Sequence, residues 1–158
     1  KNNLEYRSNS HLEYASKKLK GDKEVVLAAV EEHYYALDFV SEDLLADKEF
    51  FITLLSAQHE EILECASEEL QADKEVVLAA VKNGYSLKDI SEELRDDKEV
   101  VMAAVHSRGL NLEYASEKLR GVQEVVLAAI TQDIKALKYA SEELKNNPTK
   151  QGSFDWDK

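Results

Sequence analysis

The chain has few of the residues that mark disulfide-bonded, nucleotide-binding or membrane-spanning proteins. Its 158 residues include one cysteine, one proline and five glycines. Cys65 cannot form a disulfide within the chain, so a reducing compartment is compatible with the sequence. The few glycines form neither a phosphate-cradling loop nor a Gly-x-Ser-x-Gly elbow. No apolar run approaches the roughly 18 residues that a membrane-spanning helix requires.

Basic residues are also in deficit. Lysine and arginine total 20 against 32 aspartates and glutamates, which gives a formal net charge of −12. The lysines are interleaved with glutamates and are not clustered. An acidic surface repels phosphate backbones and anionic lipid headgroups, so we expect neither nucleic acid nor a membrane as a partner. A basic or cationic partner fits this charge better.

The sequence contains one five-residue motif, here called the phrase, that recurs six times. A pattern close to Leu-Glu-Tyr-Ala-Ser occupies residues 12–16, 37–41, 63–67, 87–91, 112–116 and 137–141. The serines that end these phrases are 25, 26, 24, 25 and 25 residues apart. A fixed period of this length indicates a repeat array in which each unit contacts its neighbours.

Each repeat begins with a short amphipathic segment, here called segment A. In residues 112–119, Leu112, Ala115, Ser116 and Leu119 follow one another at steps of 3, 1 and 3, which places them on one face of a helix. We therefore predict one continuous helix from the first leucine to the last. The serine on this buried face is expected to keep two helices close and to bond back to a carbonyl one turn earlier.

The second half of the repeat, segment B, reads Asp-Lys-Glu-Val-Val-Leu-Ala-Ala-Val in its commonest form. It occupies residues 22–30, 47–55, 73–81, 97–105 and 122–130. Aspartate is a good N-cap, and the Ala-Ala pair favours a helix. Six successive apolar residues predict burial on nearly every side, and Gly84 and Gly109 stand where a left-handed C-terminal cap would end the helix. A β-strand is the alternative, because leucine-rich repeats pair a strand with a helix.

The sequence thus predicts an all-α fold, a short right-handed-type α-solenoid of helix-turn-helix repeats of about 25 residues. Residues 1–146 would form a single array of five full repeats and a partial sixth that has segment A only. Residues 147–158 would form a C-terminal cap or tail. One repeat buries too little apolar surface to offset the ordering of its backbone, so stacking must stabilise it. Phe50 and Phe51 are expected at the centre of the core. Since the sequence begins at Lys1, we expect a fragment of a longer protein.

Residues 85–105 carry the fullest form of the pattern, from Tyr-Ser-Leu-Lys-Asp-Ile-Ser-Glu-Glu-Leu to Asp-Lys-Glu-Val-Val-Met-Ala-Ala-Val. It resembles the tandem repeat family called domain of unknown function 4116, and the match runs from Leu12 to Leu144. The resemblance implies arrays within larger proteins of intracellular bacteria, including Legionella-type secreted effectors, and of some protists. It therefore implies an intracellular location, or secretion into a host cytosol. It implies no activity and no catalytic residue.

One position of segment A is aromatic in four of the six repeats, and Cys65 and Asp89 fill it in the other two. The position lies about 200° from the buried face, and an aspartate is hard to bury unpaired, so we expect partial exposure. Exposed rings beside carboxylates could stack an adenine or hold a peptide. The alternative is that each ring packs against the neighbouring repeat with its hydroxyl in water. With three nearby tyrosines, the candidate ligand-binding residues are Tyr6, Tyr14, Tyr35, Phe39, Tyr85, Tyr114 and Tyr139.

No other pattern indicates chemistry. The Lys-Glu pairs that open segment B favour modest ion pairs between repeats over a recognition strip. The four histidines lack the spacing of a metal site. The carboxylates recur in many copies, whereas a catalytic acid would be unique and set in a pocket. We therefore expect no catalytic residue, no metal and no cofactor.

These features predict a non-catalytic helical-repeat module that binds a protein or peptide, basic in character, along one face. We expect it to act as a monomer within a larger, effector-like protein. The alternative is a small-ligand module that stacks an adenine nucleotide on exposed tyrosines. The acidic surface argues against a nucleotide unless lysines and helix N-termini meet its phosphate.

Overall fold

The computed structural model describes residues 11–56 and 62–146. The chain divides into two compact units, Lys1–Asn83 and Gly84–Lys158, and each is described by itself. The described residues contain α-helices and 3₁₀-helices (labelled η) and no strand. The predicted all-α repeat fold is therefore confirmed, and the strand alternative for segment B is excluded.

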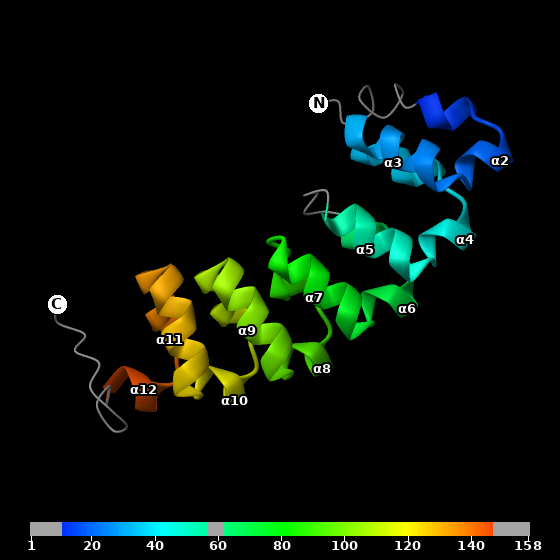
Figure 1. Cartoon of the computed structure of the whole chain (residues 1–158). Helices are drawn as coiled ribbons and strands as arrows, with labels where there is room; N and C mark the ends of the chain where they lie inside the picture. The colour runs from blue at the N-terminus through cyan, green and yellow to red at the C-terminus, as the bar shows by residue number, and fades with distance from the viewer. Residues whose placement is uncertain (1–10, 57–61, 147–158) are drawn as a thin grey trace, which may run out of the picture. The chain divides into compact units, whose positions relative to one another are not determined.

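Unit 1 contains three successive groups of helices (Figure 1). Each group consists of a 3₁₀-helix, a one-turn α-helix and a longer α-helix. The groups are η1 (His11–Tyr14), α2 (Lys17–Lys20) and α3 (Lys23–Glu32); η2 (Tyr34–Phe39), α4 (Glu42–Leu45) and α5 (Lys48–Ser56); η3 (Ile62–Cys65), α6 (Glu68–Gln71) and α7 (Lys74–Lys82).

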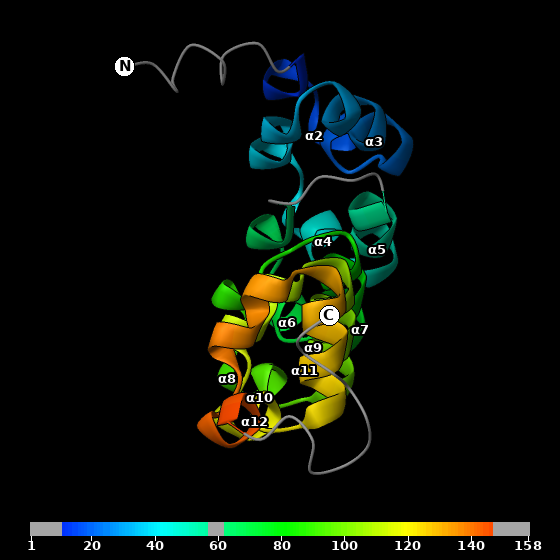
Figure 2. The ribbon, with the colours of Figure 1, turned by 90° about the vertical axis from the view of Figure 1, so that its left-hand side faces the viewer.

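Unit 2 continues the same order. Figures 1 and 2 show its longer helices side by side and its one-turn helices along the other side of the unit. Its groups are η4 (Leu87–Asp89), α8 (Glu92–Arg95) and α9 (Lys98–Ser107); η5 (Gly109–Tyr114), α10 (Glu117–Arg120) and α11 (Gln123–Gln132); and η6 (Ile134–Tyr139) with α12 (Glu142–Asn146).

Segment A is two helical pieces, so the prediction of one continuous helix was wrong. In the fifth repeat the 3₁₀-helix η5 ends at Tyr114, and α10 begins at Glu117. Between them Ala115 and Ser116 have extended backbones, with ψ of 154° and 152°. The apolar residues still fall on one side, since Leu112, Ala115 and Leu119 are all buried. The 3-1-3 spacing is compatible with both arrangements, which is why it predicts the buried face but not the break.

The repeated serine caps the one-turn helix with its side chain in five of the six repeats, Ser41 being the exception, and this corrects its predicted role. The Ser116 Oγ accepts a hydrogen bond from the N–H of Leu119 at 3.2 Å. The Ser116 N–H donates to the carbonyl of Arg95, in the preceding repeat, at 3.0 Å. Ser41 and Ser141 donate in the same way to Lys20 and Arg120, at 3.0 and 2.9 Å. The serine therefore joins adjacent repeats through its backbone and starts a helix through its side chain.

Segment B forms the longer helices, as predicted, and aspartate caps them. The Asp97 carboxylate accepts from the N–H groups of Glu99 and Val100 at 2.9 and 3.1 Å. Asp22 and Asp73 make the same pair of bonds in their own repeats. Val122 replaces the aspartate in the fifth repeat and makes no cap, yet α11 still begins at Gln123. Packing of α11 against α9, η5 and η6 supports that helix instead.

Burial of segment B is one-sided, contrary to the prediction of burial on nearly every side. In α9, Val100, Val101, Ala104 and Val105 are fully buried, and the intervening Met102 and Ala103 are half-buried. The same pattern recurs in α7 and α11. Each longer helix therefore keeps an apolar stripe partly open to solvent, because its neighbours in the stack lie on its other sides. Phe50 and Phe51 are 2% and 0% exposed, as expected for core residues.

The two glycines predicted as helix caps differ in role. Gly84 has φ of 101°, so it is the left-handed residue that follows α7 and its C-cap Asn83. Gly109 is not in that region: the C-cap of α9 is Arg108, whose backbone is extended. A Cβ at Gly109 would lie 2.2 Å from the carbonyl oxygen of Ala129. Glycine stands at position 109 because the backbone of η5 approaches that of α11 too closely for a side chain.

Lysines at the start of segment B join adjacent repeats, as the favoured interpretation of the Lys-Glu pairs predicts. Lys23 pairs with Asp47 at 2.7 Å, and Lys48 pairs with Asp73 at 3.0 Å and with Glu75 at 2.7 Å. In unit 2, Lys98 pairs with Glu124, because the cap position of the next helix is Val122. The N-cap aspartates thus serve a helix start and an ion pair at once.

These contacts change the acidity of the aspartates. The hydrogen bond from Lys23 lowers the pKa of Asp47, and the N–H of Phe50 adds to the effect. For Asp73, burial acts to raise the pKa, but the bond from Lys48 and the helix N–H groups outweigh it and lower the pKa. Both carboxylates therefore hold their protons less firmly in the folded chain than in the unfolded one.

We expect Lys48→Met to remove part of this pH-dependent stability. A carboxylate whose pKa is depressed by folding stabilises the fold above its unfolded pKa, and that stability is lost as the pH falls through the folded value. The difference in unfolding free energy between wild type and Lys48→Met should therefore be largest above about pH 5 and shrink toward about pH 3. Urea titrations followed by circular dichroism at several pH values measure it.

Lys17→Met is the matched control, since Lys17 also opens a helix in unit 1 and is exposed. Its difference from wild type should be the same at every pH. A Lys48→Met difference that stays constant between pH 6 and pH 3 would contradict the ion-pair explanation.

Within residues 11–56 and 62–146, no helix combines the length and the apolar character that crossing a bilayer would require.

Candidate functional site

The aromatic position of segment A is exposed or half-buried in all six repeats. Tyr14 is 82% exposed, and Tyr114 and Tyr139 are half-buried. Asp89, the aspartate that suggested exposure, is exposed. The expected partial exposure is confirmed, and ligand binding by these rings stays a prediction.

The structure describes two of the three additional tyrosines of the predicted site. Tyr85 is 7% exposed, so its predicted place on a binding surface was wrong; it lies in the buried turn between Gly84 and Leu87. Tyr35 is half-buried, and its ring centroid is 3.9 Å from that of Tyr34. Tyr6 lies outside the described residues.

Two of the aromatic rings are already covered by cations of the chain itself. The Lys20 Nζ lies 5.7 Å from the centroid of the Phe39 ring, which belongs to the next repeat. The Lys138 Nζ lies 4.5 Å from the Tyr139 centroid, and its hydrogen bond with Tyr139 raises the pKa of that lysine. Packing against neighbouring residues therefore accounts for Phe39 and Tyr139 as well as ligand binding would.

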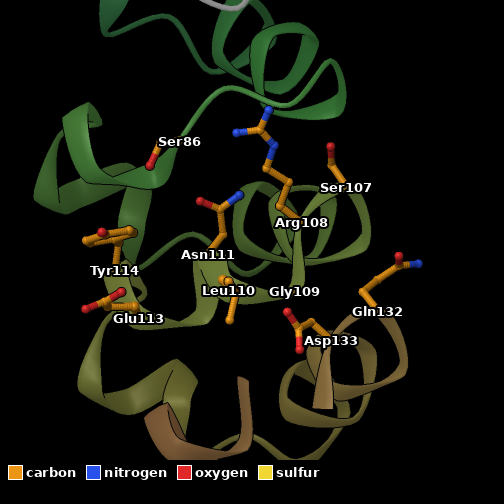
Figure 3. Close-up of a pocket in the computed structure, with 10 residues that line it drawn as sticks. All are labelled: Ser86, Ser107, Arg108, Gly109, Leu110, Asn111, Glu113, Tyr114, Gln132 and Asp133. Carbon is orange, nitrogen blue, oxygen red and sulfur yellow. The ribbon is translucent and has the colours of Figure 1, made fainter. Parts of the chain in front are cut away.

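Tyr114 has different surroundings, because it lines a hollow of about 430 Å³ in unit 2 (Figure 3). We call this the Tyr114 hollow. Its walls are the residues before η4, the C-terminal ends of α9 and α11, and the 3₁₀-helix η5. The lining residues are Ser86, Ser107, Arg108, Gly109, Leu110, Asn111, Glu113, Tyr114, Gln132 and Asp133.

The base of the Tyr114 hollow is held by Asn111, the one buried polar side chain among the described residues. Its Oδ1 accepts from the N–H of Leu87 at 3.1 Å, and its Nδ2 donates to the carbonyl of Ala104 at 3.2 Å. These two bonds join η5 to η4 and to α9. Gly109 brings the start of η5 against the backbone of α11. The base of the hollow is therefore fixed by the buried Asn111 side chain and by the close backbone contact at Gly109.

The Tyr114 hollow favours positive charge. Glu113 and Asp133 contribute two carboxylates against the single guanidinium of Arg108. The last residues of α9 and α11, Ser107 and Gln132, also lie in its wall. The C-terminal end of a helix carries a partial negative charge from its unpaired carbonyl groups, and both helices here have ten residues.

A second hollow, of about 300 Å³, also includes Tyr114 in its lining. Its other lining residues are Glu92, Arg95 and Ser116. The Nε of Arg95 is buried and has no hydrogen-bond partner. Tyr114 is thus shared by two hollows, whose linings together hold three carboxylates and two arginines.

Hydrogen bonds also order the rim of this second hollow. The Ser116 Oγ donates to the Asp96 carboxylate at 2.6 Å, and Lys118 pairs with the same carboxylate at 3.3 Å. The bond from Ser116, followed by that from Lys118, lowers the pKa of Asp96.

Sequence reasoning identified Tyr114 and placed carboxylates beside it, but missed Asp133. Asp133 lies 19 residues from Tyr114 in the sequence, and only the packing of η5 and η6 against α11 places it in the hollow. Its carboxylate also accepts from the N–H of Lys135 at 2.9 Å, which starts η6. The available sequence signal was an aspartate three residues after segment B. A helix-cap role for Asp133 would have explained that aspartate without any binding site.

Among the residues that the structure describes, no group of three or more His, Cys, Asp or Glu side chains could hold a metal ion. His106 contacts a backbone carbonyl of its own helix. Its Nδ1 lies 2.7 Å from the carbonyl oxygen of Met102.

Comparison with known proteins gives a family and no individual relative. The family model described as "Domain of unknown function (DUF4116)" matches residues 4–45, 47–95 and 73–120. No curated protein and no solved structure matches the chain.

Proposed function

Because this chain belongs to the DUF4116 family, whose description assigns no activity, we propose a function from the surface of unit 2 itself. We propose that the protein is a non-catalytic binding module for a basic peptide or protein segment. A lysine or arginine side chain of that partner would bind in the Tyr114 hollow.

The observation that carries this proposal is the combination of an aromatic ring and an excess of negative charge in one hollow. A cation gains from the face of a tyrosine ring by about 0.5–2 kcal/mol, depending on how far it is desolvated. Glu113, Asp133 and the carbonyl ends of two helices add attraction of the same sign. The formal charge of −12 would also speed the approach of a basic segment.

We expect a lysine- and arginine-rich peptide to bind more tightly than an acidic peptide of the same length. Fluorescence anisotropy with a labelled pair of such peptides measures this difference, and its loss at high salt reports the electrostatic part. Tyr114→Ala should weaken binding by roughly 2- to 30-fold, which is the range of one cation–aromatic contact. Glu113→Lys should weaken it further, since it reverses a charge in the wall.

Tyr14→Ala is the matched control, because Tyr14 occupies the same repeat position in unit 1 and is more exposed. It should leave the affinity unchanged. Equal binding of the basic and acidic peptides, or equal losses in Tyr14→Ala and Tyr114→Ala, would rule out the Tyr114 hollow as the basic site.

The adenine alternative is tested by measuring the melting temperature with adenine nucleotides present. Phosphate would be repelled by Glu113 and Asp133, so we expect adenine nucleotides to leave the melting temperature unchanged. A rise in melting temperature with a nucleotide that is lost in Tyr114→Ala would favour the alternative over the peptide proposal.

A larger, effector-like parent protein, an intracellular location and a monomeric state belong to this proposal too. The acidic chain and the family resemblance support them. The sequence of the parent protein and the mass of the chain in solution test them.

A further inference from the structure

A third hollow, of about 510 Å³, lies on the sixth repeat in unit 2 and differs in character from the Tyr114 hollow. We call it the basic hollow. Its lining residues are Ile134, Lys135, Leu137, Lys138 and Lys145. Its described lining holds three lysines and no carboxylate, which corrects the expectation that lysines are nowhere clustered in this acidic chain.

In its described residues the sixth repeat consists of η6 and α12 and has no longer helix. In the five complete repeats the leucine that opens the phrase is at most 2% exposed. The corresponding Leu137 is half-buried, and the nearby Ile134 is 64% exposed. In the fifth repeat α11 packs against η5, whereas here α12 ends at Asn146, the last described residue. Among the described residues, no longer helix packs on Leu137 and Ile134 as α11 packs on η5 in the fifth repeat.

The charge of the lining selects the chemistry of its occupant. Lys135 and Lys138 are exposed, and both belong to η6. Lys145 pairs with Glu142 at 2.8 Å, and Lys138 lies over the ring of Tyr139. An apolar floor with a cationic rim fits a segment that alternates aromatic and acidic residues, because lysine binds carboxylates and aromatic faces alike.

We propose that the basic hollow binds the chain's own residues 153–158, Ser-Phe-Asp-Trp-Asp-Lys. In this segment Phe154 and Trp156 alternate with Asp155 and Asp157, the chemistry that the hollow selects. Phe154 is the eighth residue after Asn146, and such a span reaches up to roughly 26 Å when extended. A segment on so short a tether has an effective concentration on the order of millimolar, so weak contacts suffice.

The test uses Trp156, which is the only tryptophan of the chain and so reports on this segment alone. In the whole protein its fluorescence emission should be shifted to shorter wavelength than in the urea-unfolded chain, and it should be protected from acrylamide. Ile134→Ser removes an exposed side chain of the hollow, and Lys138→Glu reverses a charge on its rim. Each should shift the emission to longer wavelength and increase quenching, with the helical circular dichroism unchanged.

Lys88→Glu is the matched control, because Lys88 follows the leucine of its own repeat as Lys138 does, and it is exposed. It should leave the emission unchanged. The proposal is overturned if Trp156 emits as in the unfolded chain, or if the Ile134 and Lys138 variants do not move an already shifted emission. A shift that disappears on dilution would assign the segment to a second copy and would equally overturn it. None of these outcomes bears on the peptide site at Tyr114, because its binding assay does not involve the tryptophan.

Discussion

Replacing Phe51 with alanine is expected to lower the free energy of unfolding by about 3–5 kcal/mol, the usual cost of a buried phenylalanine. The side chain is 0% exposed, and its ring meets that of Phe50 edge to face, with 6.2 Å between centroids and 87° between planes. The variant loses the transfer energy of the ring, the aromatic contact, and the packing around the cavity left behind.

The repeat architecture increases the consequence of this loss. In a stack of repeats, each repeat is stabilised largely by its neighbours, so a cavity in α5 weakens its packing against α7 as well. We therefore expect the unit to lose cooperativity, which would appear as a broader urea transition by circular dichroism.

Ile52→Ala is the control, because Ile52 is the next residue of α5 and is only half-buried. Its cost should be clearly smaller. If both variants lost the same free energy, the two sides of α5 would contribute equally, and the one-sided burial of segment B would not describe the energetics.

The sequence was most informative where a local cause determines the structure. The spacing of the serines predicts the repeat, and the Asp-Lys-Glu start predicts the longer helices, because an N-cap and its helix are neighbours in the chain. Segment A shows the limit of this reasoning. A serine followed by two glutamates, as at Ser67 and Ser91, is also a good helix start, and that signal competes with the apolar 3-1-3 spacing.

The candidate site could be predicted only in part, for a physical reason. Tyr114 is recognisable because its repeat position recurs and Glu113 precedes it directly, but Asp133 reaches the same hollow only through packing of η5 and η6 against α11. The basic hollow is likewise lined by Lys135 and Lys138, at positions where the fifth repeat has Leu110 and Glu113. Periodicity identifies what repeats share, whereas these hollows arise where one repeat differs from the next.

Replacing Gly109 with alanine is the second large effect, and we expect a loss of roughly 3 kcal/mol or more in unfolding free energy, at or above the upper end for overpacking. The new Cβ would lie 2.2 Å from the Ala129 carbonyl oxygen and 3.0 Å from the Asp133 amide nitrogen. Both are backbone atoms, so no rotation of a side chain relieves the contact. Either η5 or the end of α11 must move.

Gly121→Ala separates this steric effect from the general cost of replacing glycine. The added Cβ at position 121 would meet its nearest neighbour, the Lys118 carbonyl oxygen, at 3.4 Å, which is an ordinary contact. Its effect should stay within about 1 kcal/mol in either direction, since alanine also restricts the unfolded chain. Urea denaturation of the two variants measures the difference.

The Gly109 variant also tests whether backbone contacts hold the Tyr114 hollow. Gly109 is the first residue of η5, and Asn111 lies two residues further along the same helix. A displaced η5 would therefore strain the two Asn111 hydrogen bonds. Hydrogen exchange of the Leu87 amide, which donates to Asn111, should therefore accelerate in Gly109→Ala and not in Gly121→Ala. Equal stability and equal exchange in the two variants would mean that η5 and α11 are not in close backbone contact, and the walls of the hollow would have to be reassigned.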